Sequence, residues 1–425
     1  MSMSNIELES HLVQDSELNH EKKLGKSSQG HEVNSATPKK SLKSIIYNPT
    51  VRAIFFQSLL LLGVGLFVFT VINNALDNLA LRGISTGFDF LNQTAGFGIG
   101  MSLISYDETH TYGATFIVGL LNTALVAALG IAFATLLGFL VGIAKLSKNW
   151  ILSRAAAVYI ETFRNLPLLL QILFWYTVVL QAMPSPRNSL SIGDAIFLNV
   201  RGLFFPALVP GEKGWLVGIA FILALSLSMF VHWISRKKQR ETGHSLPAWR
   251  YTLILITVIP LLAFFILGKP IGIEYPVLKG FNFQGGIDVM PELFALLIAL
   301  SIYTAAFIAE IVRSGITSVS KGQTEAASAL GLRPGLTLKL VVIPQAMRVI
   351  IPPLTSQYLN LVKNSSLAMA IGYPDLVSVF AGTTLNQTGQ AIEIISMTMA
   401  VYLTFSLLTS LLMNLFNRKM ALVER

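Results

Sequence analysis

The chain has 425 residues, of which 53% are apolar and only 12% carry a charge. Soluble domains hold about 25% charged residues, so this composition excludes an ordinary soluble protein and indicates a polytopic membrane protein. The formal net charge of +9 fits positive residues in cytoplasmic loops better than a nucleic-acid-binding surface. Cysteine is absent, which excludes disulfides and thiolate metal sites, and the six histidines follow no metal-ligand spacing.

Eight apolar stretches follow a polar start. Residues 1–50 have the composition of a disordered cytoplasmic tail and show no cleavable signal peptide. Each later stretch is long enough for a bilayer core of about 30 Å. Pro167 interrupts the third stretch, and Pro352-Pro353 weakens the seventh. The predicted spans are 51–75, 116–144, 151–183, 215–234, 251–267, 292–312, 346–371 and 391–416.

The positive charges predict the orientation of these spans. With the N-terminus inside, 23 of the 31 Lys and Arg residues fall in cytoplasmic segments and 6 fall on the opposite side. Arg164 and Lys363 lie within spans. Positive residues accumulate on the cytoplasmic side, so both termini are expected there, including a tail at 417–425, while Asp375 is expected to face the periplasm.

A short polar segment separates the sixth and seventh spans. Ser320 and Gln323 match the capping box of a helix start, and Gly331 suits the position after a helix end, where φ is positive. The predicted helix is too short to cross a bilayer, and its alanines would let another surface approach its backbone. A second short helix is predicted at 336–343, ending at Pro344. The alternative is an ordinary amphipathic linker helix.

This segment resembles the E-A-A loop of ABC-importer permeases. The resemblance rests on Glu325-Ala326-Ala327, then Gly331, then Ile343-Pro344. Other stretches are similar to the polar amino acid permease branch, although Asn165-Leu166 replaces the Gly-Thr that commonly precedes its proline. These stretches are Asn122-Thr123, Lys145-Leu-Ser147, Phe163-Arg164-Asn-Leu-Pro167, Ala309-Glu310 to Ile316 and Val362-Lys363-Asn364-Ser-Ser366.

The resemblance implies an all-α integral membrane protein of about eight transmembrane helices, with a type I ABC-importer permease core and extra helices. The core would be residues 115–416, with a two-helix insertion at about 184–290 and a cytoplasmic coupling loop at 314–345. Residues 51–114 would add a first transmembrane helix and a periplasmic loop. In that loop, Arg82-Gly-Ile-Ser-Thr-Gly87 is similar to the larger permease subunits of general L-amino acid importers.

The function implied is the permease subunit of an ATP-driven amino acid importer in a bacterial inner membrane. The chain has no complete Walker motif, so ATP and Mg would be bound by a partner ATPase, with no cofactor and no catalysis in this chain. The implied partners are an ATP-binding subunit dimer, a second homologous permease, a periplasmic amino-acid-binding protein, the amino acid and membrane lipid, without nucleic acid. The implied ATPase-coupling residues are Gly322, Glu325, Ala326, Ala327 and Gly331.

Polar residues inside the predicted spans are the candidates for a substrate pathway, because such residues are costly in a membrane. Four of them, at 357, 360, 363 and 364, share one helix face, which either lines a pathway or bonds neighbouring helices. Arg164 follows Glu161 by three residues, and this pair is either structural or part of the pathway. Glu310 and Arg313 are expected to form a structural pair. The full set of candidates is Arg164, Gln171, Gln357, Asn360, Lys363, Asn364 and Ser365.

Two other classes of protein remain as alternatives. A secondary amino acid transporter or channel would work without an ATPase, and such a chain often shows paired broken helices in two internal halves. The sequence shows no clear internal repeat, and a docking loop would have no purpose there. A membrane anchor or assembly protein would not explain Lys363 and Arg164 within spans.

Overall fold

The computed structural model describes residues 49–81, 87–243 and 247–420. The predicted tail at 1–50, most of the 82–87 motif and the last residues of the C-terminal tail therefore lie outside the described residues. The chain divides into two units, Met1–Asn78 and Leu79–Arg425. The described part of the first unit belongs to one helix, α3 (Pro49–Leu81), whose apolar stretch Val51–Ala75 is long enough to cross a membrane.

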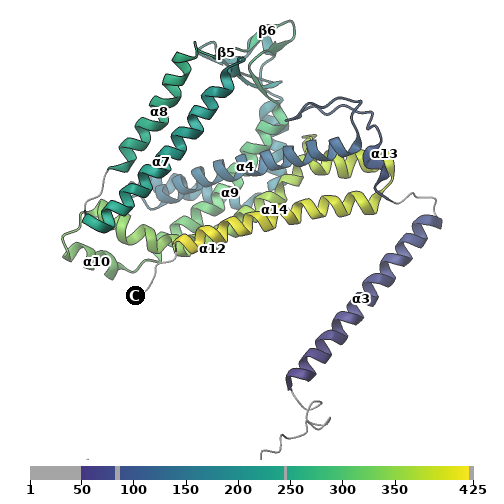
Figure 1. The fold of residues 1–425 in the computed structure, drawn as a ribbon, viewed down its shortest axis with the longest axis horizontal. Coiled ribbons are helices and arrows are strands. Elements are labelled where there is room, and N and C mark those ends of the chain that lie inside the picture. Colours follow the sequence, from purple (N-terminus) through teal and green to yellow (C-terminus); the bar gives the residue numbers. More distant parts are fainter. Residues whose placement is uncertain (1–48, 82–86, 244–246, 421–425) are drawn as a thin grey trace, which may run out of the picture. The chain divides into compact units, whose positions relative to one another are not determined.

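Four long helices form the core of the second unit (Figure 1). α4 packs along α9, and α12 packs against both α9 and α14. Buried apolar side chains of α4, α9 and α12 form much of the core, and shorter elements around them add further buried residues. The bounds are α4 (Tyr112–Lys145), α9 (Pro291–Thr317), α12 (Ile343–Asn364) and α14 (Ala391–Met420), with a short 3-10 helix η1 (Asp89–Asn92) before α4.

Glycines on α4 allow its close approach to α9. A Cβ atom added to Gly138 would lie 2.6 Å from Cβ of Ile308, and one added to Gly142 would lie 2.8 Å from the carbonyl oxygen of Ala309. Without side chains at these two positions, the two helix backbones pack directly against each other. Lipid tails are as apolar as leucine, so the hydrophobic effect does not drive membrane helices together. Such helices associate through close packing instead, which small residues at the interface allow.

The predicted third span is broken, as expected, next to Pro167. α5 (Trp150–Asn165) and the following helix, α6 (Leu168–Leu173) with the π-helix η2 (Phe174–Leu180), meet at an angle of 107°. Asn149 begins α5, and its side chain accepts from the N–H groups of Ile151 and Leu152 at 3.0 and 3.3 Å. Proline removes a backbone donor and clashes with the preceding turn, which explains the break.

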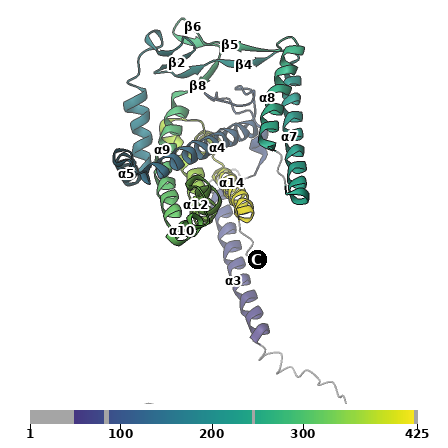
Figure 2. The same cartoon turned by 90° about the vertical axis from the view of Figure 1, so that its left-hand side faces the viewer.

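The region at 184–290 contains the two predicted helices as a hairpin. It also contains short strands that were not predicted. α7 (Gly214–Thr242) and α8 (Ala248–Ile266) lie side by side, and the strands gather at the N-terminal end of α9 (Figure 2). The antiparallel sheets have the orders β1-β2-β3-β8, β4-β5 and β6-β7. The bounds are η3 (Pro186–Asn188), β1 (Leu190–Ile192), β2 (Ile196–Asn199), β3 (Gly202–Phe205), β4 (Ala207–Pro210), β5 (Ile271–Glu274), β6 (Val277–Lys279), β7 (Asn282–Gln284) and β8 (Ile287–Val289).

The segment after α9 differs from the prediction in one respect. α10 (Lys321–Ala329) and α11 (Pro334–Thr337) are separate helices, but α11 continues through the π-helix η4 (Leu338–Val342) into α12. The predicted end of a helix at Pro344 is therefore wrong. The wide turn of η4 ends at Val342, just before α12 begins. Pro344 therefore occupies the first turn of α12, where a missing N–H group leaves no hydrogen bond unmade.

The rest of the second unit contains short helices between α12 and α14. They are η5 (Ser365–Ile371), the π-helix η6 (Val377–Thr384) and α13 (Leu385–Thr388). Seven helices of the described chain are long and apolar enough to cross a membrane, and the bent pair around Pro167 makes eight if it counts as one span. The predicted fold class of a helical membrane protein with about eight spans is confirmed.

The close packing of α4 on α9 predicts that Gly138→Ala destabilises the protein. The added methyl group would overlap Ile308, and overpacking of this kind costs about 1–3 kcal/mol. Gly218→Ala in α7 is the matched control, because no atom lies within 4 Å of its added Cβ. Thermal unfolding of the purified protein should show a lower midpoint for Gly138→Ala only. Equal midpoints for the two variants would contradict the close packing.

Candidate functional site

The predicted coupling helix begins and ends where the sequence indicated. Ser320 is the residue before α10, with an extended backbone, but its side chain makes no capping bond. The capping-box prediction is therefore wrong, and the side chain of Gln323 instead accepts from Nε2 of Gln345 at 3.3 Å. Gly331 has φ +75°, as predicted. The N–H of Gly331 donates to the carbonyl oxygen of Ser328, and the N–H of Leu332 donates to the carbonyl oxygen of Ala327. These two hydrogen bonds together form a Schellman motif at the end of the helix.

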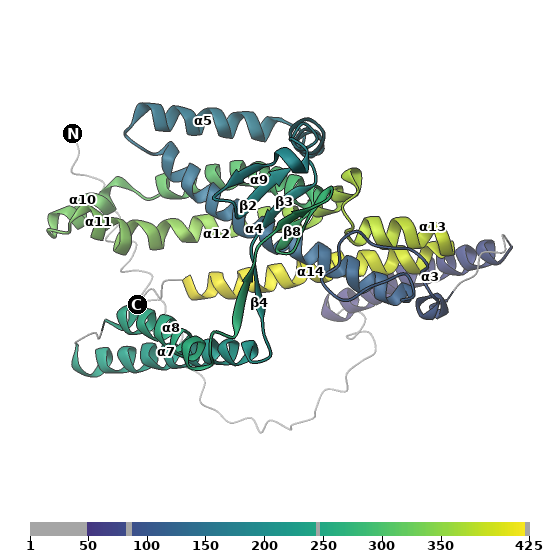
Figure 3. The same ribbon diagram turned by 90° about the horizontal axis from the view of Figure 1, so that it is seen from above.

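Figure 3 shows α10 next to α11 at one end of the second unit, and the residues of α10 differ strongly in exposure. Ala327 is 3% exposed and packs inside this chain, so its methyl group does not lie on the outer surface of the helix. Gly322, Glu325 and Ala329 lie opposite Ala327, at helical positions separated by three and four residues, and all three are exposed. Next to them, Leu330 is 81% exposed. The outer face of α10 therefore combines two small residues, one carboxylate and one large apolar side chain.

An ion-pair cluster lies between α4 and the C-terminal half of α9. Nζ of Lys145 lies 3.0 Å from Oε2 of Glu310, and Nε of Arg313 donates to Oε1 of Glu310 at 2.9 Å. The predicted structural pair of Glu310 and Arg313 is confirmed, with Lys145 as a third member. The cluster joins the two helices that approach most closely, one turn before the segment that leads to α10.

The four predicted polar residues of α12 share the face that this chain leaves open. Asn360 and Lys363 are exposed, and Gln357 and Asn364 are half-buried. Leu354, Tyr358 and Leu361, which lie beside this stripe on the helix, are buried against α4, α9 and α14. Lys363 forms no ion pair with any residue that the structure describes. Glu310 is already paired with Lys145 and Arg313.

Ser365 does not belong to this open face. Its side chain is buried, and its hydroxyl group donates to the carbonyl oxygen of Val362 at 2.8 Å. The adjacent Ser366 hydroxyl donates to the carbonyl oxygen of Lys363 at 2.8 Å. Both serines therefore satisfy carbonyl groups at the end of α12, where the last turn of a helix leaves acceptors without partners.

Gln171 spans the break in the third predicted span. It is 5% exposed, and its Nε2 group donates to the carbonyl oxygens of Phe163 and Leu166 at 3.1 Å each. These carbonyls belong to the C-terminal end of α5, so the side chain supplies donors that the broken helix lacks. Its Oε1 atom has no hydrogen-bond partner among the described residues.

Arg164 contacts an aromatic ring instead of Glu161. Its guanidinium carbon lies 5.1 Å from the centre of the Phe307 ring on α9, and no ion pair between Arg164 and Glu161 occurs within the described chain.

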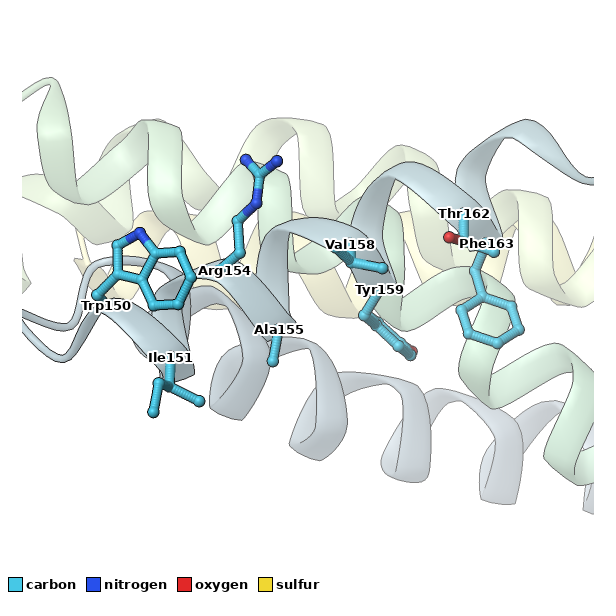
Figure 4. Close-up of a pocket in the computed structure, with 8 residues that line it drawn as sticks. All are labelled: Trp150, Ile151, Arg154, Ala155, Val158, Tyr159, Thr162 and Phe163. Carbon is cyan, nitrogen blue, oxygen red and sulfur yellow. The ribbon is translucent and has the colours of Figure 1, made fainter.

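The outer face of α5 forms a shallow groove, and Arg154 is the charged residue in its lining (Figure 4). The lining residues are Trp150, Ile151, Arg154, Ala155, Val158, Tyr159, Thr162 and Phe163.

A buried polar cluster joins α4, the η5–η6 connection and α14. Nδ2 of Asn122 donates to the carbonyl oxygens of Met101 and Pro374 at 2.9 and 2.8 Å, and the Thr123 hydroxyl group accepts the N–H of Leu376 at 3.0 Å. Asp375, which is expected on the periplasmic side, is completely buried among these groups.

The carboxylate of Asp375 acts as a helix cap. It accepts the N–H of Ser378 at 2.8 Å and the hydroxyl group of Tyr402 at 3.3 Å. Burial raises the pKa of the Asp375 carboxyl to about 6, although these hydrogen bonds lower it in part. The sequence signal that indicates this role is a carboxylate three residues before Ser378, at the start of a helix.

The fold and the exposed short helix define a class of membrane transport subunit, and comparison with known proteins supports this. Residues 247–422 match the family described as binding-protein-dependent transport system inner membrane component. The putative amino-acid ABC transporter permease protein YhdX of Escherichia coli (strain K12) is 54% identical over 378 residues, which cover 89% of this chain and 96% of YhdX.

Two further relatives extend over similar lengths. The general L-amino acid transport system permease protein AapQ of Rhizobium johnstonii is 50% identical over 385 residues, covering 91% of this chain and 96% of AapQ. The glutamate/glutamine/aspartate/asparagine transport system permease protein BztB of Rhodobacter capsulatus is 42% identical over 415 residues, covering 90% of this chain and 97% of BztB. The chain therefore belongs to the family of ABC transporter permeases that form the inner membrane component of binding-protein-dependent systems.

Membership of this family confirms the predicted resemblance and the predicted class. The chain is a multi-pass membrane permease subunit and not an enzyme. The predicted similarity to permeases of general L-amino acid systems is likewise confirmed.

Burial of Asp375 predicts a component of stability that depends on pH. Its pKa in the folded protein, about 6, is above the ordinary 3.8, so the folded state binds the proton more tightly. The free energy of unfolding should therefore fall by about 3 kcal/mol as pH rises from about 4 to about 6, since the pKa is shifted by about two units. Above that pH this component should stay constant. Asp375→Asn should remove this component from pH-dependent thermal unfolding.

Asp89→Asn is the matched control, because Asp89 is exposed. It should keep the pH dependence of the unchanged protein. If Asp375→Asn and Asp89→Asn show the same pH profile, the carboxyl group of Asp375 is not the source of the effect.

Proposed function

We propose that this permease is a subunit of an ATP-driven bacterial importer of amino acids and that it docks its ATPase through α10. The observation that carries the proposal is the outer face of α10. An ordinary linker helix would have no reason to combine Gly322, Ala329 and an 81% exposed Leu330 on a helix of nine residues. Small residues let another surface approach the helix backbone closely, and burial of Leu330 against that surface would be favourable. The amino acid class rests on the names of the relatives.

The orientation follows from the charge distribution. With 23 of 31 Lys and Arg residues in the segments assigned to the inside, α10 and both termini are cytoplasmic. The strands at the other end of α9 then lie on the outer face, where a binding protein would deliver the amino acid. A second permease subunit completes the membrane unit, in keeping with the transport systems to which the relatives belong.

The connections of α10 suit a part that transmits movement. Gln323 links it to Gln345 at the start of α12, and Ala327 packs it on this chain. The ion pairs of Glu310 join α9 to α4 close to the same end. A displacement of α10 would therefore move the inner ends of α9 and α12 together. ATP and Mg are expected to bind in the partner ATPase, which supplies the energy for alternating access.

The coupling contact is assigned to the outer face of α10. Among the predicted coupling residues, Gly322, Glu325 and Ala326 are exposed, while Ala327 supports the helix from beneath and Gly331 shapes its end. Ala329 and Leu330 join this set because of their exposure.

The open face of α12 is the proposed substrate pathway. Asn360 and Lys363 are exposed, with Gln357 and Asn364 half-buried beside them, so this stripe would line a space shared with the second permease. A positive charge that forms no ion pair with any described residue is available for the α-carboxylate of an amino acid. Gln171, Arg164 and Ser365 have partners within the chain, and we assign them structural roles.

The docking proposal predicts that a bulky side chain on the outer face of α10 blocks assembly. Ala329→Trp should abolish co-purification of the ATPase and uptake, since an indole ring prevents close approach to the helix. Glu325→Lys should weaken both if the ATPase offers a positive partner. Gln239→Trp, at an exposed position near the end of α7, is the matched control and should leave both unchanged.

The same measurement tests the orientation and the class. Normal ATPase co-purification and uptake by Ala329→Trp would contradict docking through α10. Uptake by the unchanged protein without any ATPase would favour the alternative, a secondary amino acid transporter or channel.

The pathway proposal predicts that Lys363→Met reduces uptake without affecting assembly. The substitution keeps much of the length of the side chain and removes the charge. Hydrogen bonds to charged groups contribute about 1.5–3 kcal/mol, so the uptake rate should fall by about 10- to 100-fold. Lys339→Met, at an exposed position of η4, is the matched control. Loss of the assembled complex, or unchanged uptake, would assign Lys363 a structural role or none.

A further inference from the structure

A polar pocket of about 620 Å³ lies at the end of α9 opposite to α10. Its walls come from the end of η2, the turn between β2 and β3, strand β7 and the first turn of α9. The volume lies within the range of about 300–1,000 Å³ that small-molecule sites occupy. Unlike the α5 groove in Figure 4, it is lined by both a cation and an anion, Arg201 and Glu292.

Arg201 is held at the pocket by its backbone while its side chain stays available. The buried Asn199 accepts the N–H of Arg201 at 2.8 Å, and Nδ2 of Asn199 donates to Ser189 at 3.0 Å. These bonds define the turn from β2 to β3. The guanidinium group forms no ion pair with any residue in the described parts of the chain, and Arg201 is exposed.

The acceptors of the pocket are also incompletely used. Oε1 of Glu292 accepts the hydroxyl group of Tyr176 at 2.9 Å, and within the described residues Glu292 has no ion pair. Oδ1 of Asn282 is buried and has no hydrogen-bond partner in the described structure. A buried acceptor without a partner costs free energy, which a ligand with N–H groups would recover.

We propose that this pocket binds the zwitterionic head of an α-amino acid. The guanidinium of Arg201 would bind the α-carboxylate, since its planar donors suit two parallel bonds to carboxylate oxygens. Glu292 and Oδ1 of Asn282 would bind the α-ammonium. The pocket leaves room for side chains of different kinds, which suits a broad amino acid range. This inference rests on the proposed function for its substrate class and on the proposed orientation for its outer location.

The site is separate from the polar face of α12. Glu292 stands in the first turn of α9, whereas α12 packs through Leu354, Tyr358 and Leu361 in one cluster with Ile308 and Val312 of the C-terminal half of α9. A zwitterion bound at Glu292 and Arg201 therefore occupies the outer mouth of the permease, before it reaches Lys363. Such a site would hold the amino acid near the entrance after the binding protein releases it.

Direct binding to the assembled permease–ATPase complex, without binding protein, tests the proposal. The probe is radiolabelled L-glutamine, measured by equilibrium binding to the complex in lipid nanodiscs. Arg201→Gln and Glu292→Gln should each raise the Kd at least tenfold. The matched controls Lys213→Gln and Glu212→Gln make the same charge changes at exposed positions in the loop before α7, and should leave the Kd unchanged.

Ligand variants assign each contact. N-acetyl-L-glutamine lacks the ammonium group, so its weak competition should not depend on Glu292. L-Glutaminamide lacks the carboxylate, so its competition should not depend on Arg201. Co-purification of the ATPase with each variant shows that the complex is folded.

The outcomes separate this inference from the proposed function. If the unchanged complex transports glutamine with its binding protein but Arg201→Gln and Glu292→Gln bind the probe as tightly as the unchanged complex, the pocket is not the site and the importer function stands. If neither binding nor uptake of any amino acid occurs with the complete transporter, the proposed function itself fails.

Discussion

The structure depends on one constraint, which is that backbone groups inside a membrane find partners within the protein. At three irregular points of the chain, a side chain supplies the missing hydrogen-bond partner. Gln171 gives two N–H donors to carbonyls at the broken end of α5. The Nδ2 group of Asn122 likewise donates to the carbonyl oxygens of Met101 and Pro374. Asp375 accepts an N–H where η6 begins. Polar residues that look like transport sites in the sequence can therefore be the support of an irregular backbone.

This constraint explains how the polar candidates divided. Ser365 bonds the carbonyl group of Val362 at the end of its own helix and is buried with it. The side chains of Asn360 and Lys363 instead lie on the face that the chain leaves uncovered. Helical spacing places 357, 360, 363 and 364 on one face, but spacing alone does not tell whether that face meets another helix or open space. Only the packing of the neighbouring Leu354, Tyr358 and Leu361 against other helices, together with the exposure of Asn360 and Lys363, shows it.

Much of the fold was predictable because hydropathy over about 20 residues reports directly on membrane crossing. The eight predicted spans, the break at Pro167 and the bounds of α10 follow from local signals of this kind. The strands at 190–210 and 271–289 were missed, since each has only three or four residues, and two of the pairings, β3 with β8 and β4 with β5, join segments on either side of α7 and α8. The continuous helix through Pro344 was missed because a π turn before proline leaves no mark in composition. Burial of Ala327 depends on how α10 lies on the chain, which an isolated helix pattern does not contain.

The exposure of Leu330 has a consequence for the life of the subunit before assembly. An apolar side chain that is almost fully in water on a tightly turned helix end is a surface to which chaperones, proteases and other copies of the chain can bind. If the ATPase docks on α10 as proposed, it would cover Leu330 and so protect the permease from such binding. Synthesis of the subunit in excess over its partner would leave a population open to degradation, so that the cell keeps the two components in proportion without a separate sensor.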